Sequence, residues 1–114
     1  MKEDAVYLRH ILDAIDKIDS YAVVGKETFM TTTHWQDAII HNLEIIGEAT
    51  KRLSDALKQS NSEIRWRNVA GLRDVLIHDY MGVDLEVIWN VIVRDLPELK
   101  KSILKCLPKS SQPL

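Results

Sequence analysis

The sequence predicts an all-α protein that folds as a single up-and-down bundle of four to five helices. Its 114 residues are enough for one domain with a real core. Only four glycines and three prolines interrupt the chain, which favours long helices over many short strands. Apolar residues recur at the i, i+3, i+4, i+7 spacing of amphipathic helices. We expect one domain over residues 1–107 and a flexible C-terminal tail at 108–114.

The first two helices are expected over Glu3–Tyr21 and Trp35–Lys58. A connector follows Gly25 and has room for one short helical turn. Thr33 and Gln36 are spaced as a capping box at the start of the second helix. The apolar stripes of the two helices are Leu8, Ile11, Leu12, Ile15 and Ile18 in the first, and Ile39, Leu43, Ile46, Leu53 and Leu57 in the second.

A third helix is expected over Arg65–Tyr80, after a second capping box formed by Ser60 and Glu63 and before a C-terminal stop at Gly82. A fourth helix starts after Asp84, a typical N-cap residue. Its apolar stripe includes Leu85, Ile88, Trp89 and Ile92. Pro97 either kinks this helix or begins a fifth that contains Leu99 and Ile103.

The composition limits the possible partners and the location of the protein. With 15 basic and 17 acidic residues the chain has no overall basic field for coating nucleic acid, so any contact with nucleic acid is local. Its single cysteine, Cys106, rules out an internal disulfide and fits a reducing cytosol. The charged start and the short apolar runs predict a cytoplasmic protein without a signal peptide or membrane span.

The stretch Gly71–Tyr80 concentrates side chains that could act on a phosphodiester. Arg73 is a permanent cation whose planar fork matches phosphate oxygens, and His78 can exchange a proton near neutral pH. Asp74 and Tyr80 add a carboxylate and a phenol. The same residues could instead form a structural network, with Arg73 paired to Asp79 or to a glutamate of the second helix.

Helix geometry separates these side chains. On an ideal helix Arg73 and Tyr80 lie within about 20° of each other, whereas His78 lies on the opposite side, aligned with Gly71 and Asp74. Either the helix loosens near His78, or another surface completes the site. A homodimer with two such helices side by side would supply that surface, and Gly71 would permit their close approach.

No metal or cofactor site is predicted. Glu44 and Glu48 are one turn apart, but no His-x-x-x-His or Glu-x-x-His spacing accompanies them, which favours solvated or ion-paired carboxylates. His34 and His41 share a face, but no further ligands can be identified. No Gly-rich phosphate loop is present.

The full pattern Arg73-x4-His78-x-Tyr80 resembles the signature of the HepT-like branch of HEPN ribonuclease toxins. The similarity covers most of the chain in order: Leu43–Leu53, the Trp66–Arg67 pair, Gly71–Trp89 and Asp95–Leu99. Two positions depart from the family pattern. Arg65 stands where a proline is usual, which puts the start of the third helix in question, and Asp74 stands where asparagine is common.

The resemblance implies a HEPN-like homodimer whose two motifs meet in a shared cleft. Such proteins are metal-independent endoribonucleases that are held in check by a small MntA-like nucleotidyltransferase antitoxin. Carried over to this chain, His78 would be the general acid or base, Arg73 would hold the scissile phosphate of the RNA, and Asp74 would orient one of them. Tyr80 would be the side chain to which the antitoxin adds AMP.

Two other classes of function remain open from the sequence. The domain could be a non-catalytic nucleotide-binding adaptor for a nucleotidyltransferase, or a structural dimerising bundle. Cleavage of RNA in the presence of EDTA would separate the enzyme from both.

Overall fold

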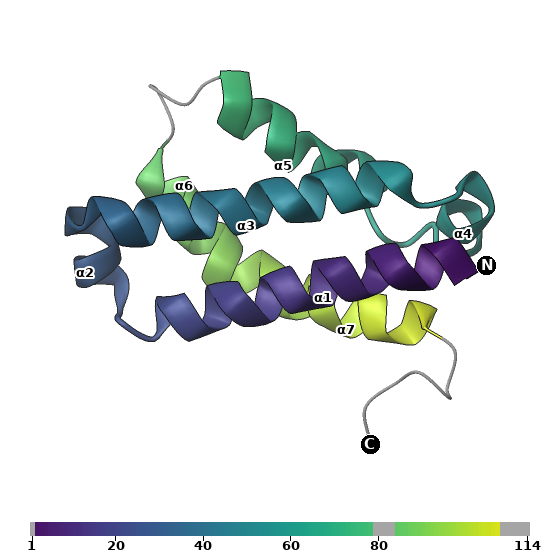
Figure 1. The fold of residues 1–114 in the computed structure, drawn as a ribbon, viewed down its shortest axis with the longest axis horizontal. Coiled ribbons are helices and arrows are strands. Elements are labelled where there is room, and N and C mark those ends of the chain that lie inside the picture. The colour runs from purple at the N-terminus through teal and green to yellow at the C-terminus, as the bar shows by residue number, and fades with distance from the viewer. Residues whose placement is uncertain (1, 79–83, 108–114) are drawn as a thin grey trace.

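The computed structural model describes residues 2–78 and 84–107, with side chains described for residues 3–72 and 84–107. Every regular element in these ranges is helical, which confirms the all-α class, whereas the described residues form more and shorter helices than the four to five predicted. The centre of the bundle is an antiparallel pair of long helices, α1 (Lys2–Ala22) and α3 (Thr33–Arg52) (Figure 1). α5 (Trp66–His78) packs on α3, and α7 (Leu96–Cys106) packs on α1.

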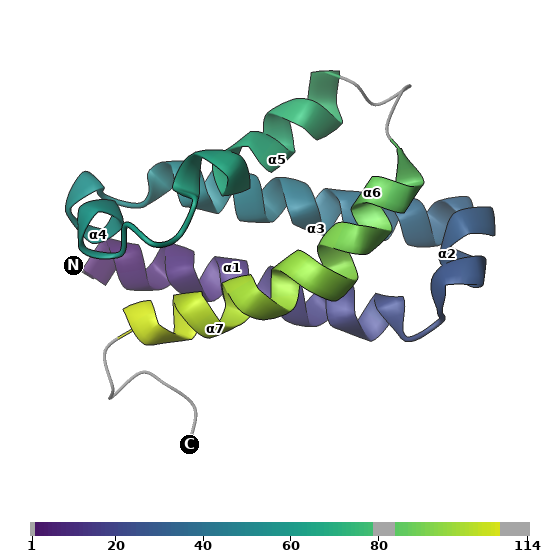
Figure 2. The ribbon, with the colours of Figure 1, turned by 180° about the vertical axis from the view of Figure 1, so that it is seen from behind.

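The core lies between the α1–α3 pair and the C-terminal helices, which cross it diagonally (Figure 2). α1 begins and ends within a residue of its predicted bounds, because its apolar stripe faces this core along its whole length. No helix in the described part of the chain is long and apolar enough to span a membrane. The side chains that meet in the core include Leu8, Ile11, Ile15, Ile18, Ile39, Leu43, Ile46, Ile88, Ile92, Leu96 and Ile103.

The predicted single helix over Trp35–Lys58 is wrong, because the chain breaks at Leu53 and restarts as α4 (Asp55–Ser60). Asp4, in the first turn of α1, causes the break. Its carboxylate accepts hydrogen bonds from the Ser54 backbone N–H at 2.8 Å and from the Ser54 hydroxyl at 2.6 Å. The Ser54 hydroxyl in turn accepts from the Leu57 N–H at 3.2 Å and caps α4.

The connector before α3 contains a short helix, α2 (Lys26–Thr31), which confirms the expected short turn. The predicted capping box of Thr33 and Gln36 is wrong. α3 starts at Thr33 without a side-chain cap, and Gln36 Nε2 donates instead to the Phe29 carbonyl at 2.9 Å. Phe29 is fully buried, with its ring centroid 5.4 Å from that of Trp89.

The start of α5 is fixed by Trp66, within one residue of the predicted start, so the departure at Arg65 does not move it. Trp66 Nε1 donates to the carbonyls of Lys58 and Asn61 at 3.2 and 3.1 Å. The capping box predicted from Ser60 is wrong, because Ser60 ends α4 instead. The predicted helix end at Tyr80 and the stop at Gly82 lie outside the described residues.

The last helices, α6 (Leu85–Asn90), the π-helical turn η2 (Val91–Asp95) and α7, follow one another without a loop. Asp84 caps α6 as predicted, accepting from the Glu86 N–H at 2.9 Å. The Leu96 N–H donates five residues back to the Val91 carbonyl. This wider turn directly precedes Pro97, which has no N–H and lies in the first turn of α7. Pro97 therefore begins a helix that contains Leu99 and Ile103.

Candidate active site on helix α5

The backbone of α5 carries three of the four predicted site residues: Arg73, Asp74 and His78. Tyr80 lies outside the described residues. The side chains of residues 73–78 are not among those described, so the predicted contacts among Arg73, Asp74 and His78 remain predictions. The structure does give the positions of these three residues along and around the α5 backbone.

The helix geometry excludes one of the two ways in which Arg73 and His78 were expected to meet. α5 remains α-helical through His78, so the backbone does not loosen between the two residues. Five residues along an α-helix correspond to about 7.5 Å of rise and about 140° of rotation. Completion of the site by a second surface is the remaining alternative.

α5 has a packed side and an open side. Val69 and Leu72 are partly buried against the core on the packed side. On the open side Arg67 is exposed, and a Cβ atom added to Gly71 would meet no atom within 4 Å. Among the described elements, α3 is the only one in extensive contact with α5. The positions of Arg67, Gly71, Asp74 and His78 all fall within a sector of about 60° around the helix axis.

A groove of about 500 Å³ separates the packed side of α5 from η2 and α7. Leu72, directly before Arg73, lies on its wall. Sequence reasoning missed this groove, because it depends on the angle between α5 and the C-terminal helices, which no local pattern encodes. The lining consists of Ile64, Arg65, Asn68, Val69, Leu72, Val91, Asp95, Leu96, Glu98, Leu99 and Ser102.

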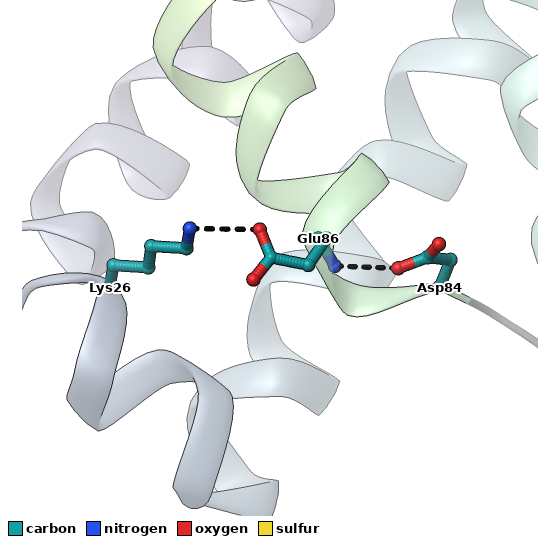
Figure 3. A network of polar contacts seen from close by, with 3 residues as sticks. All are labelled: Lys26, Asp84 and Glu86. Atoms are coloured by element: carbon teal, nitrogen blue, oxygen red, sulfur yellow. Dashed lines mark hydrogen bonds and ion pairs between the residues drawn. The ribbon is translucent and has the colours of Figure 1, made fainter.

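An ion pair between α2 and α6 lies close to residue 84, where the described part of the chain begins again after α5. Lys26 Nζ lies 2.8 Å from Glu86 Oε2, and the Glu86 N–H donates to the capping carboxylate of Asp84 (Figure 3). The pair joins α2 to the first turn of α6. Both side chains are about half exposed, so the pair orients the two helices more than it stabilises the fold.

The other titratable groups do not form a second centre within the described residues. No cluster of three or more His, Cys, Asp or Glu side chains could hold a metal ion there. Glu48 pairs with Arg52 at 3.7 Å, as expected for an ion-paired carboxylate. Burial, together with the charge of Glu63, raises the pKa of the Cys106 thiol, which keeps it protonated and weakly nucleophilic at neutral pH.

A protein-family model matches most of the chain. The family model described as ribonuclease HepT-like matches residues 11–106. The chain therefore belongs to the HepT-like ribonuclease family, as the motif and its surroundings predicted.

Several curated relatives carry ribonuclease names. A putative RNase of Caldanaerobacter subterraneus subsp. tengcongensis is 37% identical over 96% of this chain and 98% of its own length. A probable ribonuclease HepT of Thermococcus cleftensis is 42% identical over 82% of this chain and 86% of its own. A gamma-glutamylcyclotransferase and putative RNase of Methanocaldococcus jannaschii is 42% identical over 93% of this chain, which spans 48% of that relative. No solved structure matches the chain significantly.

Proposed function

We propose that the chain is a metal-independent endoribonuclease whose site is a cleft between the α5 helices of a homodimer. The observation that carries this proposal is the spacing of Arg73 and His78 on one uninterrupted helix of a HepT-like ribonuclease. Because the two positions point about 140° apart, one helix alone does not bring them to one phosphate. The open side of α5 offers the surface on which a second copy would complete the site.

In the proposed reaction His78 moves the protons and Arg73 binds the phosphate. A positioned histidine that takes the proton of the 2′-hydroxyl, or protonates the leaving oxygen, contributes about 10²–10⁴-fold. The guanidinium of Arg73 neutralises the charge that develops on the phosphoryl oxygens. Asp74 orients one of these two groups. Attack by the 2′-oxygen breaks the P–O5′ bond and leaves a 2′,3′-cyclic phosphate and a 5′-hydroxyl.

The test of this chemistry is cleavage of RNA by the purified protein in EDTA. We expect cyclic-phosphate ends, and loss of cleavage in both His78→Ala and Arg73→Ala with an unchanged circular dichroism spectrum. A requirement for magnesium, or normal cleavage by His78→Ala, would show the mechanism to be wrong. A folded wild-type protein that binds nucleotide but never cuts RNA would instead support the non-catalytic adaptor.

The proposed biological role is the toxin of a toxin–antitoxin pair. Its antitoxin would be an MntA-like nucleotidyltransferase that transfers AMP from ATP to the Tyr80 hydroxyl and releases pyrophosphate. The new phosphodiester would place an anion near Arg73, where it competes with the RNA backbone. We expect AMP adducts on Tyr80 after co-expression with the cognate enzyme, and loss of cleavage. Tyr80→Phe should escape this inhibition; adducts elsewhere, with Tyr80 unmodified, would exclude this role.

A further inference from the structure

Arg67 lies on the open side of α5, in line with the proposed site. Its position is seven residues from Asp74 and eleven from His78, which on an α-helix places each of the two within about 20° of Arg67 around the helix axis. The axial separations are about 10.5 and 16.5 Å. Between them lies Gly71, where a Cβ atom added to the helix would meet no atom of the same protomer within 4 Å.

The stability of the fold does not explain an arginine at this position. The Arg67 side chain is exposed and has no ion-pair or hydrogen-bond partner within the part of the chain that the structure describes. It also lies in the first turn of α5, which contains no acidic residue. A cation in the first turn opposes the helix macrodipole, so this placement does not stabilise α5.

We propose that Arg67 binds the RNA backbone on the open side of α5, at a phosphate some nucleotides away from the cleaved bond. This inference rests on the proposed ribonuclease function and extends its site along the helix. A guanidinium binds phosphate in a bidentate, charge-assisted manner and suits a single-stranded substrate of any sequence. The chain carries no general basic field, so a few placed cations must hold the strand.

A binding contact remote from the reacting atoms predicts a particular kinetic signature. Arg67 would hold the substrate and the transition state equally, so its loss should raise KM and leave kcat unchanged. We expect Arg67→Gln to raise KM for a mixed-sequence single-stranded RNA on the order of tenfold. The slope of log KM against log salt concentration should fall by about 0.7 per lost phosphate contact. Arg67→Lys should restore much of the affinity.

Arg94→Gln is the matched control, because Arg94 is an exposed arginine on η2 that is not on α5 and does not line the groove beside it. It should leave KM and the salt dependence unchanged. An unchanged KM in Arg67→Gln, or a fall in kcat alone, would overturn the inference. So would a shift of the monomer–dimer equilibrium in ultracentrifugation, which would make Arg67 an interface residue.

Cleavage and binding of the same RNA, measured separately, distinguish failure of the Arg67 inference from failure of the proposed ribonuclease function. If the wild-type protein does not cut RNA, the ribonuclease proposal fails, and fluorescence anisotropy still measures RNA binding by the full chain. Weaker binding by Arg67→Gln than by Arg94→Gln would then support the Arg67 contact alone. Equal binding by the two variants would overturn it.

Discussion

Asp4 is a nearly buried carboxylate whose hydrogen bonds decide where α3 ends and α4 begins. Burial by itself raises the pKa of Asp4. The hydrogen bonds from the Ser54 hydroxyl and backbone N–H, with the charge of Lys58, outweigh burial and lower the pKa below the ordinary value of 3.8. The folded protein therefore favours the ionised carboxylate, which accepts both hydrogen bonds.

We predict that Asp4→Asn lowers the free energy of unfolding at pH 6 by about 1–3 kcal/mol, since the amide cannot accept both hydrogen bonds. The exposed Asp13→Asn on the same helix is the control and should change it little. Urea unfolding with a fluorescence readout measures both. An Asp4→Asn variant as stable as Asp13→Asn would show that the Asp4–Ser54 contact does not hold this junction.

The pH dependence follows from the lowered pKa of Asp4. A depressed carboxyl pKa contributes stability that is fully present above the unfolded value and is lost as the pH falls through the folded value. The stability difference between the wild type and Asp4→Asn should therefore shrink as the pH falls below 3.8. A difference that stays constant or grows in this range would contradict the assignment.

At the scale of elements, Gly71 and Gly25 differ in whether the backbone conformation requires a glycine. Gly71 lies inside α5 with open space around its absent side chain. Gly25 precedes α2 with φ +91°, a conformation that favours glycine, although the space around it is also open. Nothing within the described chain requires a glycine at position 71, so a second copy that packs against α5 would explain it.

We predict that Gly71→Ala raises the stability of the monomer by up to about 1 kcal/mol, the difference in helix propensity, and weakens the dimer. Gly25→Ala should instead lower stability, because alanine is strained at positive φ. Thermal unfolding at low concentration and sedimentation equilibrium measure the two effects. A dimer of unchanged affinity in Gly71→Ala would place Gly71 outside the interface.

The sequence predicted well those elements that are determined by residues close together in the chain. The stripe of α1 and the cap of Asp84 depend on residues close in the chain, and both were confirmed. The break at Leu53 was missed because its cause, Asp4, lies about fifty residues away and no periodicity reports it. The spacing of Arg73 and His78 predicted the separation of the two positions around α5. The exposure of the side of α5 that carries Arg67 could not be predicted from the sequence, because it depends on how α5 packs against the other helices.

At the scale of the whole molecule, the bundle is a slab with principal extents of 41 × 32 × 20 Å. α5 lies at one edge, in extensive contact with α3 alone among the described elements, which leaves its outer side available to a partner. A symmetric dimer through this edge would place two copies of each motif about one two-fold axis. Because Arg73 and His78 of one α5 helix lie about 140° apart, we expect each site to combine Arg73 of one protomer with His78 of the other, and the alternative to be tested is a site built from one protomer's motif alone.

Purified heterodimers with two different affinity tags distinguish these two arrangements. If Arg73 of one protomer acts with His78 of the other, a heterodimer of Arg73→Ala with His78→Ala retains one intact site of two. Because the sites are related by symmetry, we predict about half of the wild-type activity for this heterodimer. The control is a heterodimer of the wild type with the double variant, which has no intact site in this arrangement and should be inactive. The reverse pattern would show that each site uses one protomer's motif, and full activity in a protein that sediments as a monomer would exclude the shared cleft.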